Sequence, residues 1–282
     1  MIFRKLSIVL LFFPLAAFTQ ADEKMELINR MLKANEHLVT AKFTLFTEER
    51  LIDGKFFKTE RLTKLHAKPK KIYFYSITPN PGTEILWKEG WMDEKMLVSP
   101  KSFPFITFSL KTTSSIARKD SHHSLEDIGF EYMSSLIVYY RDHYGDRFYD
   151  FVSILDTVSW DNHQCIRVSF DFREYAVINY TVKKDENVIT IAKNNYLNDY
   201  SILMLNSEID DYEDVEAGQV IKIPNSYCRK LEFFIDMRTW LPLKQLIYDT
   251  KGLYERYEMK SFILNPSFSE AEFTPDYKDY KF

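Results

Sequence analysis

Glycine and cysteine are scarce in this sequence, which has seven glycines and two cysteines among 282 residues. The glycines lie too far apart to form the loops that bind dinucleotides or phosphates, or the G-x-S-x-G turn of many hydrolases. The motifs H-E-x-x-H and C-x-x-C, which hold zinc in many proteins, are also missing. With these signatures absent, we expect a protein that is not an enzyme and that needs neither a cofactor nor a metal ion.

Aromatic side chains are abundant, at 16 % of the residues, with 23 Phe and 18 Tyr. Phe and Tyr favour strands because their rings pack well on a pleated, half-buried surface. Apolar residues make up 45 % of the chain, which is enough for a sizeable core. The composition therefore predicts a folded, β-rich body of about one or two domains.

The first 21 residues have the order of a secretory signal peptide. Arg4 and Lys5 precede an apolar run at 6–18, and small residues follow at Thr19 and Ala21. This run is shorter than the roughly 20 apolar residues that a membrane-spanning helix needs. We therefore expect cleavage near Ala21 and a soluble, periplasmic or otherwise exported protein without a transmembrane anchor.

The expected mature chain is mildly acidic. The segment 1–21 contains two basic residues and no acidic one, so its removal changes the net charge from −4 to −6. A negative net charge opposes binding to nucleic acid, whose phosphates attract basic proteins. We therefore expect no nucleic-acid partner.

Beyond residue 40 the apolar pattern is mostly that of strands. One amphipathic helix is expected at 23–40 and a second at 124–143, where Ser124 and Asp127 form a capping box. The expected strands lie at 42–51, 55–66, 70–78, 83–88, 95–99, 151–159, 165–172, 229–236, 241–249 and 253–262. Several carry bulky residues on both faces, for example Phe43 and Phe46. This pattern fits a curved antiparallel sheet that is covered by helices or encloses an apolar space, and it fits a filled core equally well.

A segment at 180–225 interrupts the rhythm of the strands. It predicts a short strand at 180–183, helices at 187–194 and 200–205, and a closing strand at 220–223. The segment resembles the LysM module, a βααβ unit of cell-wall-binding proteins. The matching positions are Tyr180-Thr181-Val182, Ile191-Ala192, Ile202-Leu203, Leu205-Asn206 and Gly218-Gln219-Val220-Ile221-Lys222-Ile223-Pro224.

The LysM resemblance implies binding of a glycan that contains N-acetylglucosamine, such as peptidoglycan, in a groove between two loops. The implied groove residues are Asp185, Glu186, Asn187, Asn206, Ser207, Glu208 and Ile209. The first loop departs from the family, because Asp185-Glu186-Asn187 replaces the usual Gly-Asp-Thr. A module that no longer binds sugar and acts only as a spacer is the alternative.

The rest of the chain resembles a bacterial family designated domain of unknown function 1571, which is similar in architecture to the lipoprotein carriers of the Lol pathway. The resemblance rests on Asn80-Pro81-Gly82-Thr83-Glu84, Arg118-Lys119-Asp120-Ser121-His122-His123, Gly129-Phe130, Phe234-Ile235-Asp236, Leu241-Pro242 and Tyr248-Asp249-Thr250-Lys251-Gly252. It implies an α+β fold, in which a curved antiparallel β half-barrel wraps over helices and carries the βααβ module as an insertion.

The implied half-barrel domain is discontinuous. It takes residues 22–178 and 227–282, and the inserted module takes residues 179–226. In the carriers, an apolar cavity between sheet and helices holds acyl chains. The residues that we expect to line such a cavity here are Phe43, Phe74, Phe130, Met133, Ile137, Phe170 and Phe233.

Cys165 and Cys228 lie far apart in this arrangement. Cys228 begins its strand near the insertion, whereas Cys165 lies about ten residues along the partner strand, or roughly 33 Å away. A disulfide needs Cα atoms within about 7 Å of each other. We therefore expect two free thiols.

His122 and His123 form the densest polar cluster of the body, together with Asp120, Glu126 and Asp127. Such residues near a helix start are compatible with a metal or proton-transfer site, although their spacing matches no recurrent zinc pattern. The alternative is a capped and solvated helix N-terminus, where acidic side chains favour the helix dipole. The role of the two histidines stays open.

The sequence thus predicts an exported envelope protein that binds a lipid, such as a lipoprotein acyl chain, or another apolar ligand in the half-barrel. The module would tether this protein to peptidoglycan. A peptidoglycan-binding structural protein with a filled core is the first alternative. An envelope enzyme that modifies glycans or lipids is the second, and it requires a pair of carboxylates that converge in a cleft.

Overall fold

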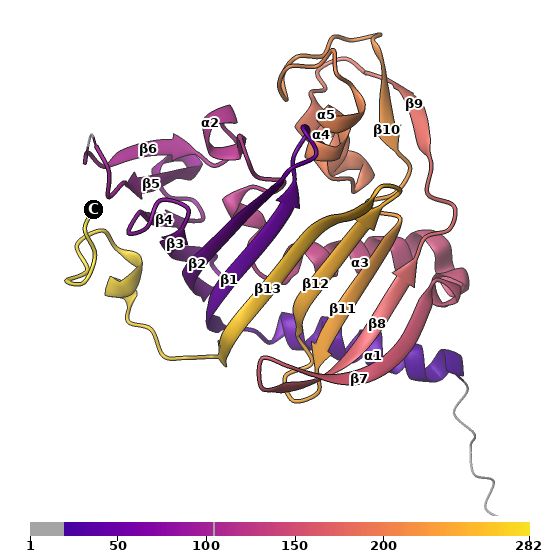
Figure 1. The fold of residues 1–282 in the computed structure, drawn as a ribbon, viewed down its shortest axis with the longest axis horizontal. Helices are drawn as coiled ribbons and strands as arrows, with labels where there is room; N and C mark the ends of the chain where they lie inside the picture. Colours follow the sequence, from indigo (N-terminus) through magenta and orange to yellow (C-terminus); the bar gives the residue numbers. More distant parts are fainter. Residues whose placement is uncertain (1–19, 104) are drawn as a thin grey trace, which may run out of the picture.

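The computed structural model describes residues 20–103 and 105–282. Residues 1–19 of the expected signal peptide lie outside the described part, so the signal peptide stays a prediction. Within the described part, an antiparallel sheet of eleven strands forms the body of the molecule (Figure 1). None of the described helices is long and apolar enough to cross a membrane.

The large sheet is open, with β6 and β7 as its two edges. Its strand order is β6 (Phe108–Lys111), β5 (Lys95–Ser99), β4 (Glu84–Lys88), β3 (Lys71–Thr78), β2 (Phe56–His66), β1 (Thr40–Arg50), β13 (Gly252–Leu264), β12 (Pro242–Asp249), β11 (Lys230–Asp236), β8 (His163–Asp171) and β7 (Val152–Trp160). Figure 1 shows the β3–β6 end turning away from the plane of the other strands. The expected α+β fold with a curved antiparallel sheet is confirmed.

Two helices, α1 (Gln20–Glu36) and α3 (Glu131–Tyr144), lie against one face of the sheet (Figure 1). Each helix buries one apolar stripe at helical spacing. The buried side chains are Leu27, Ile28, Met31 and Leu32 of α1 and Met133, Leu136, Ile137 and Tyr140 of α3. They join Phe170 and Phe233 of the sheet in one core cluster, which fixes α3 on the β8–β11 half.

The helix expected at 124–143 is two separate elements, so this prediction is wrong. Ser124 and Asp127 form the expected capping box, but they cap only a 3₁₀ turn, η2 (Leu125–Asp127). Gly129 then adopts a φ of +112°, and an added Cβ there would lie 3.1 Å from Leu65. The chain therefore turns at Gly129, and α3 begins only at Glu131.

The other expected elements are present, with ends that differ by a few residues. The first helix ends at Glu36 rather than at residue 40, because β1 already begins at Thr40. Short elements without a clear apolar period escaped the prediction. These are η1 (Met92–Glu94), β6, α2 (Ser115–Arg118), η3 (Gly145–Asp150) and η4 (Glu270–Phe273).

Cys165 and Cys228 are both buried and free, as expected. Cys165 pairs with Asp236 at one end of the β8–β11 ladder, whereas Lys230, two residues after Cys228, pairs with Asp171 at the other end. Burial and the nearby carboxylate of Asp236 raise the pKa of the Cys165 thiol to about 11. This thiol therefore stays protonated and unreactive at neutral pH.

The inserted module has the expected βααβ order. It consists of β9 (Val177–Thr181), α4 (Val188–Asn195), α5 (Asp199–Leu205) and β10 (Val220–Pro224). Its two strands form a sheet of their own, which projects from one end of the large sheet (Figure 1). The module also has its own core cluster, which includes Ile191, Ile202 and Ile221.

Truncation of Phe170 should test the filled core between α3 and the sheet. Phe170 has no exposed surface, and its ring centroid lies 5.5 Å from that of Phe233. We expect Phe170→Ala to lower the free energy of unfolding by about 3–5 kcal/mol, measured by urea denaturation. The control Leu62→Ala removes a side chain that is 44 % exposed and should change it by less than about 0.5 kcal/mol. Similar losses in the two variants would contradict a packed core at Phe170.

Candidate functional site

Both helices of the module begin at an asparagine that caps them. The Asn187 side chain accepts a hydrogen bond from Thr190 N at 2.8 Å, and the Thr190 hydroxyl oxygen accepts one from Asn187 N at 2.8 Å. Asn198 caps α5 by accepting from Ser201 N at 3.1 Å. Asparagine is among the preferred residues at this position because its short side chain satisfies free backbone N–H groups. These caps fix the loops that precede the two helices.

In the first implied groove loop, Glu186 forms hydrogen bonds within the module, whereas Asp185 is exposed. Glu186 accepts hydrogen bonds from the Tyr180 hydroxyl at 2.9 Å and from Lys183 N at 2.9 Å. Asp185 is exposed and has a φ of +63°, in the left-handed region that glycine adopts most easily. This left-handed conformation explains why glycine is usual at this position of the LysM pattern. Aspartate can replace the glycine because it also tolerates this region.

The second implied groove loop also mixes buried and exposed residues. Asn206 is only 1 % exposed, donates to Ile202 O and Lys222 O, both at 2.7 Å, and accepts from Lys222 N at 2.8 Å. Ile209 is buried in the core of the module. Ser207 and Glu208, in contrast, are exposed. Of the seven implied residues, Asp185, Ser207 and Glu208 therefore present the most surface to a ligand.

Tyr212 and Glu213, which follow the second loop, form hydrogen bonds with the first loop and the start of α4. Asn187 Nδ2 donates to the Glu213 carboxylate at 2.9 Å, and Val188 N donates to Tyr212 O at 2.9 Å. Acidic side chains therefore surround this end of the module. Carboxylates accept hydrogen bonds from sugar hydroxyls, so the geometry is compatible with a neutral oligosaccharide.

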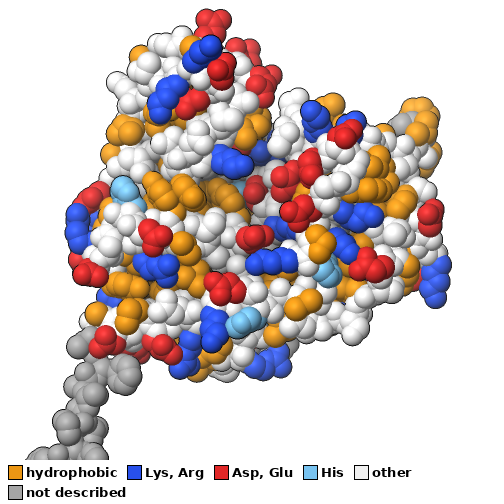
Figure 2. All heavy atoms as spheres, turned by 180° about the vertical axis from the view of Figure 1, so that it is seen from behind, with side chains coloured by type: hydrophobic (Ala, Val, Ile, Leu, Met, Phe, Trp, Pro, Cys, Tyr) orange, Lys and Arg blue, Asp and Glu red, His pale blue; other side chains and the backbone are white. Residues whose placement is uncertain are grey.

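A cleft of about 650 Å³ separates the module from the body. Figure 2 shows the hollow beneath the projecting module, with hydrophobic side chains along its edge. Its walls come from the 113–136 segment of the body and from α4, the α4–α5 loop and the start of α5. The lining side chains include Arg118, His123, Asp127, Tyr132 and Leu136 of the body and Ile189, Lys193, Tyr196, Leu197, Asn198 and Asp199 of the module.

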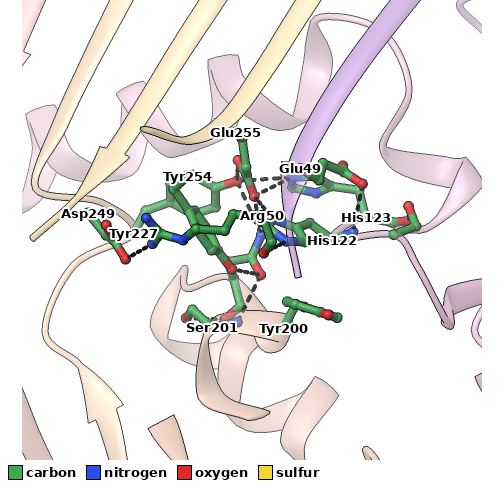
Figure 3. A network of polar contacts seen from close by, with 12 residues as sticks. Glu49, Arg50, His122, His123, Tyr200, Ser201, Tyr227, Asp249, Tyr254 and Glu255 are labelled. Carbon is green, nitrogen blue, oxygen red and sulfur yellow. Dashed lines mark hydrogen bonds and ion pairs between the residues drawn. The ribbon is translucent and has the colours of Figure 1, made fainter. Parts of the chain in front are cut away.

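A buried polar network lies beside this cleft and is centred on Glu255 of β13 (Figure 3). Glu255 is not exposed at all. Its carboxylate accepts from Asn198 Nδ2 at 2.8 Å and from the Tyr227 hydroxyl at 2.8 Å, and His122 Nδ1 lies 2.8 Å away. His123 Nε2 lies 3.5 Å from the same carboxylate and 2.9 Å from the Tyr227 hydroxyl. Because Asn198 also caps α5, the network ties the module directly to the sheet.

The charges in this network shift the pKa values of both partners. Burial alone would lower the pKa of His123, but Glu255 and Asp127 outweigh it and raise the pKa to about 10. Burial would likewise raise the pKa of Glu255, but His123 and His122 bring it down to about 2. At neutral pH, His123 is therefore a cation and Glu255 an anion.

Arg118 and Tyr200 add two further links between body and module. The Arg118 guanidinium donates to both carboxylate oxygens of Asp199, at 2.7 and 3.2 Å, and to His122 O at 3.0 Å. Tyr200 stacks on the His122 ring with centroids 4.4 Å apart. A bidentate pair of this kind fixes orientation as well as distance.

The two histidines thus have a structural position that neither sequence interpretation described. His122 is 1 % exposed, so the solvated helix start is wrong for the histidines, although the Ser124 cap is correct. Among the described residues, no group of three or more His, Cys, Asp or Glu side chains is placed to hold a metal ion. No local pattern in the sequence indicated Glu255, Asn198 or Tyr227, because each lies more than 70 residues from His122 along the chain.

The residues expected to line an apolar cavity fall into two core clusters. Phe43, Phe74 and Phe130 belong to one, and Met133, Ile137, Phe170 and Phe233 to the other. All seven are buried. The apolar pocket beside Met133, between the start of α3 and the sheet, has a volume of only about 40 Å³. The role of these residues in ligand binding stays a prediction.

Comparison with known families gives two matches. Residues 40–188 match the family model described as protein of unknown function (DUF1571), which covers more than half of the chain. Residues 180–224 match the LysM domain, so the resemblance of the module is confirmed. No curated protein matches the sequence.

Several solved structures are similar over most of the chain, at low identity. The lipoprotein LppX of Mycobacterium tuberculosis is 10 % identical with a TM-score of 0.40, over 88 % of this chain and 97 % of its own. LprF from Mycobacterium bovis is 10 % identical with a TM-score of 0.39, over 88 % and 96 %. A LolA superfamily protein from Nitrosomonas europaea is 10 % identical with a TM-score of 0.35, over 90 % and 98 %.

Loss of the Glu255 charge should lower the free energy of unfolding and reduce the dependence of this free energy on pH. The raised pKa of His123 contributes stability that is complete below about pH 6.5 and is lost as the pH rises through about 10. The lowered pKa of Glu255 contributes stability that is complete above about pH 4.5 and is lost as the pH falls through about 2. Urea denaturation of the wild type should therefore show stability falling towards both extremes.

In Glu255→Gln, the buried histidines lose their anion. We expect a loss of about 3 kcal/mol or more at neutral pH and a smaller decline of stability between neutral and alkaline pH. The control Glu26→Gln removes an exposed partner of Arg30 and should cost about 0.5 kcal/mol or less. An alkaline decline as steep in Glu255→Gln as in the wild type would show that the histidine–carboxylate pair is not its cause.

Proposed function

Because the chain belongs to the family of proteins of unknown function designated DUF1571 and carries a LysM domain, we propose that it is an exported envelope protein that binds glycan. The glycan contains N-acetylglucosamine, and peptidoglycan is the expected form. The LysM match over 180–224 is the observation that carries this proposal. The protein acts by binding rather than by catalysis.

The exposed loop residues of the module support this proposal. Asp185, Ser207 and Glu208 offer hydrogen-bonding groups at the surface, while Asn187 and Asn206 hold the loops in place through their own hydrogen bonds. A loop that is held before the ligand arrives loses little entropy on binding. The buried links to Glu255 and Arg118 further keep the module in one orientation on the body.

Export is part of the same proposal. The signal peptide at 1–21 would deliver a mature chain with a body of residues 22–178 and 227–282 and the module at 179–226. A glycan-binding module is useful only where the glycan is, and peptidoglycan lies outside the cytoplasmic membrane. The proposed compartment and the proposed ligand therefore agree.

A bulky side chain at Ser207 should block the proposed groove without unfolding the module. We expect Ser207→Trp to lower binding to insoluble peptidoglycan, measured by co-sedimentation, by about tenfold or more, because the side chain takes the place of the ligand. The control Val177→Trp adds the same ring at an exposed position at the far end of β9. Equal binding by both variants, or no binding by the wild type, would contradict glycan recognition by these loops.

A second candidate function is binding of a lipid or another apolar ligand. The cleft of about 650 Å³ favours it, because Tyr132, Leu136, Ile189 and Tyr196 give this cleft apolar walls. The small pocket beside Met133 cannot hold an acyl chain unless α3 moves away from the sheet. We therefore place such a ligand in the cleft.

Native mass spectrometry of protein purified gently from its own envelope tests this second function. A bound hydrophobic molecule should add a defined mass that organic extraction removes. Ser135→Trp, at the wall of the cleft, should abolish the added mass, whereas Asp142→Trp on the same helix should retain it. Protein without any added mass, or with the same added mass in both variants, would exclude the cleft as a lipid site.

A further inference from the structure

The connection between β5 and β6 exposes an unusual amount of apolar surface. Phe103 is 87 % exposed, Phe105 68 %, Ile106 63 % and Phe108 41 %. We call these four residues the aromatic loop. β5 and β6 lie at the edge of the large sheet, and the connection between them extends away from the body (Figure 1).

The exposure of the aromatic loop contrasts with the burial of the aromatic residues in the core. No more than 2 % of the surface is exposed in each of Phe43, Phe130, Phe170 and Phe233. Single exposed apolar residues are common on protein surfaces and need no explanation. Here four lie within six consecutive positions, and exposed apolar side chains that gather in this way mark interaction sites, including sites that contact a membrane.

The charge around the aromatic loop has the opposite sign to the whole chain. Residues 95–119 contain five basic residues and no acidic one, whereas the net charge of the chain is −4. Lys95, Lys101 and Lys111 belong to the hairpin itself, and Lys101 lies in the connection between its strands, whereas Arg118 and Lys119 lie beyond it, with Arg118 buried against Asp199 of the module. Lys95 and Lys111 are paired in register across β5 and β6, so two of these charges lie together at the base of the hairpin.

We propose that the aromatic loop inserts into the interface of an anionic phospholipid bilayer. Phenylalanine and isoleucine side chains transfer from water to the boundary between headgroups and acyl chains, and the lysines lie beside the headgroup phosphates. An anionic membrane surface attracts both the apolar side chains and the basic charges, whereas a purely apolar partner attracts only the apolar side chains. With only four apolar side chains, the attachment is reversible.

The position of the loop gives this contact a consequence for the proposed glycan binding. The module is inserted between β8 and β11 and projects from the edge of the sheet where β1 and β12 end and β13 begins, away from the tip of the β5–β6 hairpin (Figure 1). A bilayer at the hairpin therefore leaves the loops of the module free. The protein would bridge a membrane surface and the cell-wall glycan.

Vesicle flotation tests the proposal with the mature chain, since the apolar run at 6–18 would itself bind lipid. The wild type should float with vesicles of equimolar phosphatidylethanolamine and phosphatidylglycerol, and less with vesicles of phosphatidylcholine. The double variant Phe103→Ser/Phe105→Ser should lower the partition coefficient by about tenfold or more. The control Ile52→Ser, at a residue that is 61 % exposed on the β1–β2 turn, should float like the wild type.

The charge requirement is tested by Lys101→Glu/Lys111→Glu. This variant should lose flotation with the anionic vesicles and behave like the wild type with phosphatidylcholine. The proposal is overturned if the wild type floats with neither kind of vesicle, or if the double Phe variant floats as well as the wild type. Co-sedimentation with peptidoglycan should be unchanged in all of these variants, so a failure here is distinct from a failure of glycan binding.

Discussion

The buried carboxylate of Glu255 is the constraint on which the arrangement of body and module depends. An ionised carboxylate without contact to water is unfavourable by several kcal/mol unless charges and hydrogen bonds compensate. The compensating groups here come from three parts of the chain: the histidines before α3, Tyr227 after the module and Asn198 within it. Displacement of any of these parts removes one of the groups that compensate the charge. The network therefore favours one position of the module on the body, because other positions would leave part of the buried charge uncompensated.

The same constraint shapes the cleft. On one side, Asn198 and Asp199 fix the start of α5 to Glu255 and Arg118. On the other side, the Tyr196 ring stacks on Tyr139 of α3 with centroids 3.9 Å apart. The space between these two sets of contacts is left open, with the cationic His123 and the carboxylate of Asp127 in its wall. A ligand in the cleft would meet polar groups that are held in place before it binds, next to an apolar surface.

The sequence was a good guide where the controlling interactions are local, and a poor one elsewhere. The capping box at Ser124 depends on neighbouring residues and was predictable. The helix from 124 to 143 was not, because Ile128 and Phe130 continue the apolar spacing across the break at Gly129, although they pack in a different core cluster from the side chains of α3. Glu255 and His122 are separated by 133 residues, so no local pattern indicates their contact. Resemblance to a known module supplied the groove residues, but only the structure distinguishes the buried Asn206 from the exposed Ser207.

The structure shows what covers the bulky residues on both faces of several strands. Phe43 points into the core beneath the helices, whereas Phe46 on the opposite face is covered by Arg256 and Lys260, whose charged ends lie 5.3 and 4.9 Å from its ring centroid. Tyr73 is likewise covered by Tyr280 of the C-terminal segment, with stacked rings 3.8 Å apart. Long cationic side chains bury aromatic surface with their stems and keep their charge near water. The second face of the sheet is thus closed at these positions by the chain itself, and two-sided aromatic strands alone do not require a ligand.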